Sequence, residues 1–180
     1  MVTWPVLGTL DAVPATGRPD LLADPVARAL KDLDADRIGV AEIDPELADT
    51  AAFCAAYGSP LDRAANCVVV AGRRAGEVRY AACLALATTR VDVNGVVKKR
   101  LDVRKVSFAP MDDAVTLTGM AYGGITPIGL PADWPLWIAP GVVEADAVVV
   151  GSGIRGGKLA VPGDLLASLP NATVVEDLAR

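Results

Sequence analysis

The 180-residue chain contains no histidine. Histidine is the side chain whose charge changes most readily near neutral pH, and it is the commonest ligand of transition metals. Its absence excludes Ser-His-Asp and Cys-His catalytic sites. Any chemistry must therefore come from carboxylates, lysine, hydroxyl groups, backbone amides or the substrate itself.

Cysteine is scarce, and its spacing indicates no shared site. Cys54, Cys67 and Cys83 are odd in number and form no C-x-x-C motif. This pattern argues against a disulfide framework and against a zinc site. We expect three buried, inert thiols, and neither a metal nor a cofactor.

Aromatic residues make up only 4% of a chain that is 52% hydrophobic, so the core must consist mainly of Val, Leu, Ile and Ala. A chain of this length fits one domain. No apolar run approaches the roughly 20 residues that span a bilayer, and the first 20 residues lack the pattern of a signal peptide. We therefore expect a cytoplasmic protein with no membrane partner.

The formal net charge of −5 disfavours tight binding to a long nucleic acid, and we expect no DNA partner. Positive charge is nevertheless concentrated in "KKRLDVRK", residues 98–105. This segment is either a local basic surface or the solvated face of an amphipathic helix, and charge alone favours the second interpretation.

Local patterns predict alternating short elements. A helix should start at Asp24-Pro25, because Pro is favoured at the first helical position. Further helices are expected within 45–57, from 94, over 110–119 and over 163–168. Strands are expected at 37–43, 66–72, 77–86, 90–93, 105–108, 136–138, 147–151, 158–161 and 173–176. Without a steady β-α-β repeat, an α+β fold with a mixed sheet is favoured.

The stretch "VVVGSGIRGGKLAV", residues 148–161, contains the G-x-G-x-x-G letters of a dinucleotide-binding turn. In that motif the last glycine opens a helix that holds the pyrophosphate. Here only "GKLAV" separates Gly156 from Pro162, which leaves no room for such a helix. The context argues against an NAD-dependent oxidoreductase and predicts a strand, a glycine turn and a second strand.

The irregular segment "LTGMAYGGITPIGLP", residues 117–131, resembles the signature loop of the YbaK/EbsC family. That family comprises aminoacyl-tRNA deacylases that also occur as the editing insertion of bacterial prolyl-tRNA synthetases. The resemblance extends over about residues 38–178, in the order of the surrounding elements. The loop pattern T-G-x-x-x-G-G-[IV]-x-P-[FLI]-G is matched by Thr118, Gly119, Gly123, Gly124, Ile125, Pro127, Ile128 and Gly129.

The resemblance implies a fold and an activity. The fold is a single α+β domain with a curved, partly barrel-like mixed sheet flanked by helices, with residues 36–180 as the editing domain. Residues 1–35 are then an N-terminal extension with a helix. The implied activity is hydrolysis of the ester of mischarged tRNA in trans. The implied partners are the acceptor end of aminoacyl-tRNA and an aminoacyl-tRNA synthetase or elongation factor.

The same resemblance implies the reacting groups. A Gly-Gly pair lets backbone amides approach a ligand closely, so the amide of Gly124 and its neighbours are expected to form an oxyanion hole for the ester. Pro127 fixes the path of the loop, and Gly123, Ile125 and Thr126 contact the substrate. The 2′-OH of the substrate ribose handles protons, which suits a chain without histidine.

Asn66 departs from the family pattern. Established deacylases carry a lysine in "Y-K-T-L-[LV]", and the matching stretch here is "A-N-C-V-V-V". Three readings remain open: Asn66 orients substrate or water in a deacylase of different selectivity, Lys98 or Arg155 supplies the missing cation to a phosphate, or the protein is a non-catalytic module that binds an aminoacyl ligand or a synthetase. We favour the first.

Four further residues are candidates for contact with the substrate. Phe53 and Tyr57 occupy positions that line the amino-acid pocket in the family, although both are equally consistent with a core role. Ser152 and Gly153 lie in the glycine turn, where a hydroxyl can bond a ligand or simply the turn. We expect Gly151 and Gly153 to let the neighbouring backbone pass close to the cleft.

Overall fold

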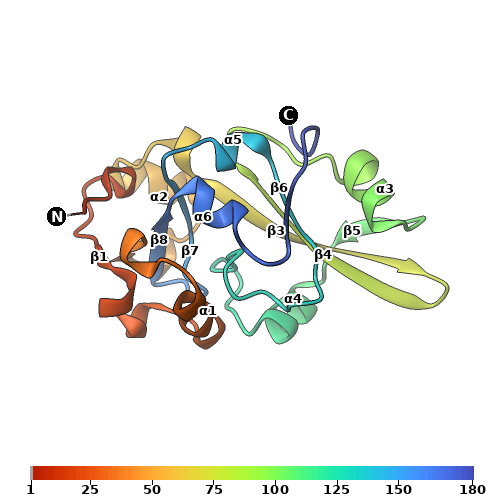
Figure 1. The fold of residues 1–180 in the computed structure, drawn as a ribbon, viewed down its shortest axis with the longest axis horizontal. Coiled ribbons are helices and arrows are strands. Elements are labelled where there is room, and N and C mark those ends of the chain that lie inside the picture. Colours follow the sequence, from red (N-terminus) through yellow and green to blue (C-terminus); the bar gives the residue numbers. More distant parts are fainter. Residues whose placement is uncertain (1) are drawn as a thin grey trace.

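The computed structural model describes residues 2–180, and Figure 1 shows two sheets with helices around them. The first sheet has the order β1-β2-β8-β7 and is antiparallel throughout. Its strands are β1 (Val13–Pro14), β2 (Gly39–Glu42), β7 (Val148–Gly151) and β8 (Gly157–Val161). The stretch 148–161 is thus the predicted strand, glycine turn and strand.

The second sheet has the order β5-β3-β4-β6-β9, antiparallel from β5 to β4 and parallel from β4 to β9. Its strands are β3 (Ala65–Arg74), β4 (Glu77–Leu86), β5 (Val106–Phe108), β6 (Leu136–Ile138) and β9 (Ala172–Val174). The predicted mixed α+β fold is confirmed. The barrel-like character is only partial, because a single parallel bridge between Ala64 and Val149 links the two sheets outside the named strands.

Six α-helices lie around the sheets in the described part of the chain. They are α1 (Asp24–Ala29), α2 (Thr50–Tyr57), α3 (Lys98–Leu101), α4 (Met111–Thr118), α5 (Pro140–Val143) and α6 (Gly163–Ala167). Asp49 caps α2 by accepting a hydrogen bond from the amide of Ala52. Both α2 and α4 end at a glycine in the left-handed conformation, Gly58 and Gly119. Short 3₁₀ turns occupy Pro5–Leu7, Ala15–Gly17, Pro19–Leu21, Leu30–Asp32, Ala35–Arg37, Pro45–Leu47 and Leu61–Arg63.

Strands β3 and β4 form a long hairpin that projects from the body of the molecule (Figure 1). The pairing runs from Ala65 opposite Leu86 to Arg74 opposite Glu77. Ala75 and Gly76 make the turn with positive φ at both positions, as tight two-residue hairpins require. Strand β4 coincides with the predicted strand at 77–86, and β3 extends beyond the predicted end at residue 72 to Arg74.

The predicted strand at 90–93 is wrong. Val91 makes only an isolated bridge with Ala179. The Asp92 carboxylate instead accepts hydrogen bonds from the amides of Gly95 and Val96 and caps a π-helical turn, Val93–Val97, which leads into α3. The capping bonds of one aspartate outweigh the strand propensity of two valines.

The largest core cluster lies between the first sheet, the hairpin and α1. Leu22, Val26 and Leu30 of the N-terminal segment pack there with Val40 and Leu159 of the first sheet. All three cysteines are free, and burial raises the pKa of the Cys83 thiol to about 12. Within residues 2–180, no helix combines the length and the apolar character needed to cross a membrane.

Candidate functional site

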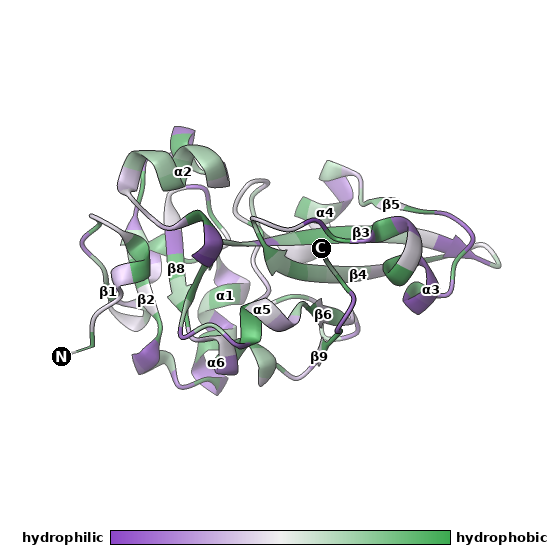
Figure 2. Ribbon diagram, turned by 90° about the horizontal axis from the view of Figure 1, so that it is seen from above, coloured by the Kyte–Doolittle hydropathy of each residue, from purple (hydrophilic) through white to green (hydrophobic). Residues whose placement is uncertain are grey.

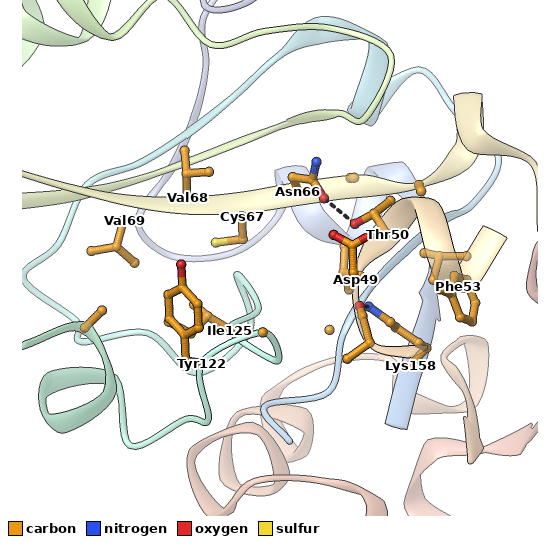
Figure 3. Close-up of a pocket in the computed structure, with 18 of the residues that line it drawn as sticks. Asp49, Thr50, Phe53, Asn66, Cys67, Val68, Val69, Tyr122, Ile125 and Lys158 are labelled. Carbon is orange, nitrogen blue, oxygen red and sulfur yellow. Dashed lines mark hydrogen bonds between the residues drawn. The ribbon is translucent and has the colours of Figure 1, made fainter. Parts of the chain in front are cut away.

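A pocket of about 530 Å³ lies where the two sheets face each other. The start of β3 and the first turn of α2 form one wall, and the end of β7, the start of β8 and the 122–125 loop form the other (Figure 3). Its lining has a polar end and an apolar end. The polar end contains Asp49, Thr50, Asn66 and Lys158, and the apolar end contains Val68, Val69, Phe108, Ala109 and Ile125.

Asn66 stands at the polar end with its side chain held by Thr50. The Thr50 hydroxyl donates a hydrogen bond of 2.7 Å to the Asn66 side-chain oxygen, as drawn in Figure 3. This bond occupies the amide oxygen and leaves the amino group, with two N–H donors, for a ligand. Asn66 therefore lies in the pocket wall with the oxygen of its side chain held by Thr50.

Lys158 projects from β8 into the same end of the pocket and is only 7% exposed. Its ammonium donates to the carbonyl oxygen of Ala48 at 2.9 Å and lies 5.3 Å from the centre of the Phe53 ring. No salt bridge within residues 2–180 includes it. Burial lowers the pKa of this ammonium, because it has lost water without gaining a paired carboxylate.

Lys158 was not predicted from the sequence. The available signal was a single charged residue in the buried strand "GKLAV", since lysine is rarely buried without a partner. Asp49 and Thr50 were also missed as pocket residues; they belong to the cap and first turn of α2.

The two glycine-rich loops are joined backbone to backbone. The Gly124 carbonyl accepts a hydrogen bond from the amide of Gly153 at 2.8 Å, and the Gly153 carbonyl accepts one from Ala121 at 2.9 Å. A Cβ atom at Gly151 would lie 2.5 Å from the Gly124 carbonyl oxygen, and one at Gly124 would lie 2.6 Å from that of Ile154. The lack of a Cβ atom at Gly151 thus lets its backbone pass close to that of Gly124, whereas a Cβ atom at Gly153 would meet the side chain of Ala23 instead.

This arrangement corrects the predicted role of the Gly124 amide. That N–H donates to the Ala121 carbonyl at 2.9 Å, so it is not free to bind an oxyanion. Gly124, Thr126 and Pro127 are buried, whereas Gly123 and Ile125 line the pocket. The first three residues support the loop, and the last two form its surface toward the pocket.

The remaining predicted contacts divide in the same way. Phe53 lines the pocket, whereas Tyr57 packs on Phe53 with the centres of the two rings 5.4 Å apart. The Tyr57 hydroxyl accepts a hydrogen bond from the amide of Asp44. Ser152 is fully buried, and its side chain lies beside Gly157 outside the pocket lining. Substrate contact by Ser152 is therefore contradicted, as is direct pocket lining by Gly153.

The two candidate phosphate-binding cations lie away from the pocket lining. The Arg155 guanidinium donates to the carbonyl oxygens of Tyr122 at 3.3 Å and Pro45 at 2.9 Å, so it ties the 122–125 loop to the segment before α2. Lys98 lies on α3 and lines a different hollow with Arg73, Arg104 and Lys105. The pocket cation is thus Lys158, from an element that neither prediction considered.

Residues 44–169 match the model of the aminoacyl-tRNA editing domain. The chain belongs to this family. The matched residues include α2, β3, the 122–125 loop, β7 and β8, which together build the pocket of this editing domain.

Individual relatives are distant. The candidate Cys-tRNA(Pro)/Cys-tRNA(Cys) deacylase EbsC of Enterococcus faecalis is 29% identical over 73 residues, which are 41% of this chain and 44% of that protein. The editing domain therefore aligns with less than half of this curated relative.

Among solved structures, a candidate trans-editing enzyme for prolyl-tRNA synthetase superposes with a TM-score of 0.72 at 19% identity, over 86% of this chain and 94% of that one. The hypothetical protein APE2540 superposes with a TM-score of 0.66 at 22% identity, over 78% and 90% of the two chains. At these identities the likeness establishes the fold.

Proposed function

We propose that this protein is a trans-editing aminoacyl-tRNA deacylase, which hydrolyses the ester between a wrongly attached amino acid and the 3′ end of tRNA. One observation carries the proposal: the editing-domain match covers the elements that build a pocket with a buried, unpaired lysine. Perturbed charged groups inside a pocket are typical of functional sites.

The lining suits an aminoacyl group. Side chains of Val69 and Ile125 offer an apolar surface at one end, while Asn66 and Lys158 offer donors at the other. Such a combination, apolar walls with a few convergent polar groups, is typical of small-ligand sites. Gly123 lines the pocket at the loop surface, and the Arg155 guanidinium lies against it where a Cβ atom would stand.

In this proposal the Lys158 ammonium lies near the ester carbonyl oxygen. Lys158 pairs with Gly151 across β7 and β8, and Gly151 in turn touches the backbone of Gly124 and Ile125. Directly opposed residues of antiparallel strands point to the same face of the sheet. The lysine side chain therefore emerges on the face that the glycine loop covers.

Hydrolysis of the ester needs no histidine in this proposal. The oxygen of water attacks the carbonyl carbon, and the C=O π electrons move to the carbonyl oxygen. Those electrons then re-form the C=O bond as the bond from carbon to the ribose oxygen breaks, and the leaving oxygen takes up the proton that water releases, with the neighbouring 2′-OH as relay. Lys158 stabilises the negative charge that develops on the carbonyl oxygen, and low local polarity strengthens that interaction.

The test is a deacylation assay with a panel of misacylated tRNAs. Wild type is compared with Lys158→Met, Lys158→Arg and Asn66→Ala, and Lys31→Met serves as the control because Lys31 is exposed and outside the pocket lining. The proposal expects ester hydrolysis by wild type and by the control, and its loss in Lys158→Met. Hydrolysis no faster than the spontaneous rate across the whole panel would overturn it.

One observation favours a second function. Asn66 stands where deacylases of the resembling family carry a lysine, which fits a non-catalytic module that binds an aminoacyl ligand or a synthetase. Wild type would then bind a non-hydrolysable aminoacyl-tRNA analogue, in which an amide replaces the ester, without accelerating hydrolysis of any ester in the panel.

A further inference from the structure

Charge is divided unevenly along the chain. Residues 73–105 contain nine Lys and Arg against three Asp and Glu, a net charge of +6. The rest of the chain contains eight basic and nineteen acidic residues, a net charge of −11. The basic segment contains the end of β3, all of β4, α3 and the approach to β5. The tip of the hairpin, α3 and β5 lie together at one end of the molecule (Figures 1 and 2).

Most of this positive charge is not neutralised locally. Asp102 accepts hydrogen bonds from Arg74 and Arg79. No other salt bridge formed by residues 2–180 reaches the segment. The cations that remain without a carboxylate partner are Arg73, Arg90, Lys98, Lys99, Arg100, Arg104 and Lys105.

Four of these cations line a common hollow. A hollow of about 810 Å³ is lined by Arg73, Lys98, Arg104 and Lys105, with Asp113 as its one carboxylate within the described chain. A third hollow lies between it and the pocket. The third hollow shares Asn66, Val68 and Phe108 with the pocket, and Asn94, Val106 and Ser107 with the basic hollow.

Phe108 stands on the wall common to the pocket and the third hollow, with 64% of its surface exposed. An exposed aromatic ring beside a positively charged groove is the arrangement on which single-stranded nucleic acid stacks its bases. An acidic protein partner would use the charges but has no need of the ring.

We propose that this basic surface, defined by Arg73, Lys98, Arg104 and Lys105, binds the phosphate backbone of a tRNA acceptor stem, while the single-stranded 3′ end runs past Phe108 into the pocket. The inference rests on the proposed function for the identity of the RNA. The negative charge elsewhere on the molecule repels the same polyanion, so the RNA meets the protein in one orientation.

The experiment measures binding and hydrolysis separately. Binding is measured with a fluorescent RNA minihelix that has a 3′-CCA end and carries no amino acid, titrated at several salt concentrations. The test variant is the double charge reversal Arg104→Glu/Lys105→Glu. The matched control is Arg28→Glu/Lys31→Glu, because both of its residues are exposed, lie outside the basic segment and change the net charge by the same amount.

The test variant should raise the minihelix Kd by at least about tenfold, and its slope of log K against log salt should be shallower by roughly one to two, since each lost phosphate contact contributes about 0.7–0.9. The control should change the Kd less than about twofold by the same reasoning. Phe108→Ala should reduce the preference for a CCA-ended minihelix over one lacking the single-stranded end.

Hydrolysis is followed on a short substrate, an aminoacylated CCA trinucleotide, which is too short to reach the basic surface together with the pocket. The test variant should hydrolyse it at the wild-type rate. Minihelix binding that the test variant retains, or that the control loses equally, overturns the docking surface. The proposal is also overturned if wild type binds duplex DNA of the same length as tightly as the minihelix, or if it binds an acidic protein but not the minihelix. Failure of the deacylase proposal appears differently, as absent hydrolysis with intact, salt-dependent RNA binding.

Discussion

The molecule presents positive charge in two contrasting ways. Lys158 is a single ammonium, 7% exposed, with one carbonyl partner and an aromatic ring beside it. The basic surface has several cations in water, among them the exposed Arg73, Arg104 and Lys105. A buried charge interacts strongly with one nearby atom, whereas exposed charges act together, over a longer range, and are screened by salt. The buried ammonium of Lys158 therefore suits a single reacting oxygen, and the exposed basic surface suits a phosphate backbone.

The largest effect should come from removing the buried charge. Lys158→Met keeps the length and the apolar stem of the side chain, so the pocket stays filled. Loss of one group that stabilises an oxyanion typically costs about 10²–10³ in kcat, and we expect a decrease of that order on every misacylated tRNA that wild type hydrolyses. Single-turnover hydrolysis measures it, with the minihelix Kd of the same variant expected to stay unchanged.

A decrease confined to acidic amino acids would instead mean that Lys158 recognises the substrate side chain. The pH profile separates these readings further. Burial lowers the pKa of the Lys158 ammonium, with Arg155 adding to the shift and Asp49 and Cys54 opposing it. The contribution of the cation should therefore disappear as pH rises through this lowered pKa. In Lys158→Arg the loss should move to higher pH, because a guanidinium stays charged.

The second effect concerns Gly151, which lets β7, the strand paired with the one that carries Lys158, lie against the 122–125 loop. Gly151→Ala would place a Cβ atom 2.5 Å from the Gly124 carbonyl oxygen and 3.1 Å from that of Ile125. These are backbone atoms, so the loop must shift, and we expect a loss of about 1–3 kcal/mol in the free energy of unfolding. Chemical denaturation measures it. Gly17→Ala is the control, since a Cβ atom there meets nothing within 4 Å; equal losses in both variants would contradict the close approach.

The third effect should be smaller and confined to RNA affinity. Arg104→Glu/Lys105→Glu is expected to raise the KM for full-length aminoacyl-tRNA about tenfold at low salt, with kcat nearly unchanged. High salt should narrow the difference from wild type, because it screens exposed charges. A lower kcat with unchanged KM would mean that the surface acts on the chemical step, and the distinction from Lys158 would fail.

Much of the fold followed from sequence, because the deciding signals were local. The short interval between Gly156 and Pro162 was enough to replace a cofactor turn with the observed hairpin of β7 and β8. The 90–93 strand failed because Asp92 caps a helical turn, a competition between local bonds that strand propensity does not include. Family membership followed from the loop pattern around Gly123 and Gly124.

The site was less predictable, since its decisive facts are long-range. The Gly124 amide was expected to bind the ester, but the loop folds back so that this amide donates a hydrogen bond to the Ala121 carbonyl. The Gly124 carbonyl accepts a hydrogen bond from the amide of Gly153, some thirty residues later. The role of Lys158 depends on which face of β8 meets the pocket, and this requires the pairing of β8 with β7. The side chain of Ser152 lies beside Gly157, outside the pocket lining, and this too depends on how the chain is arranged around the β7–β8 turn.

The smallest effect should come from the neutral donor at the pocket wall. Thr50→Val removes the hydroxyl that fixes the Asn66 oxygen but keeps the shape of the side chain. A neutral hydrogen bond contributes about 0.5–1.5 kcal/mol, so we expect a severalfold rise in KM, with kcat nearly constant, because only the orientation of Asn66 is relaxed. Asn66→Ala should produce a similar or slightly larger rise, and the double variant should add little, since the two residues act as one unit. Strictly additive effects on KM would show that Thr50 and Asn66 contact the substrate independently. The polar end of the pocket would then hold two separate neutral contacts beside the single buried cation, Lys158.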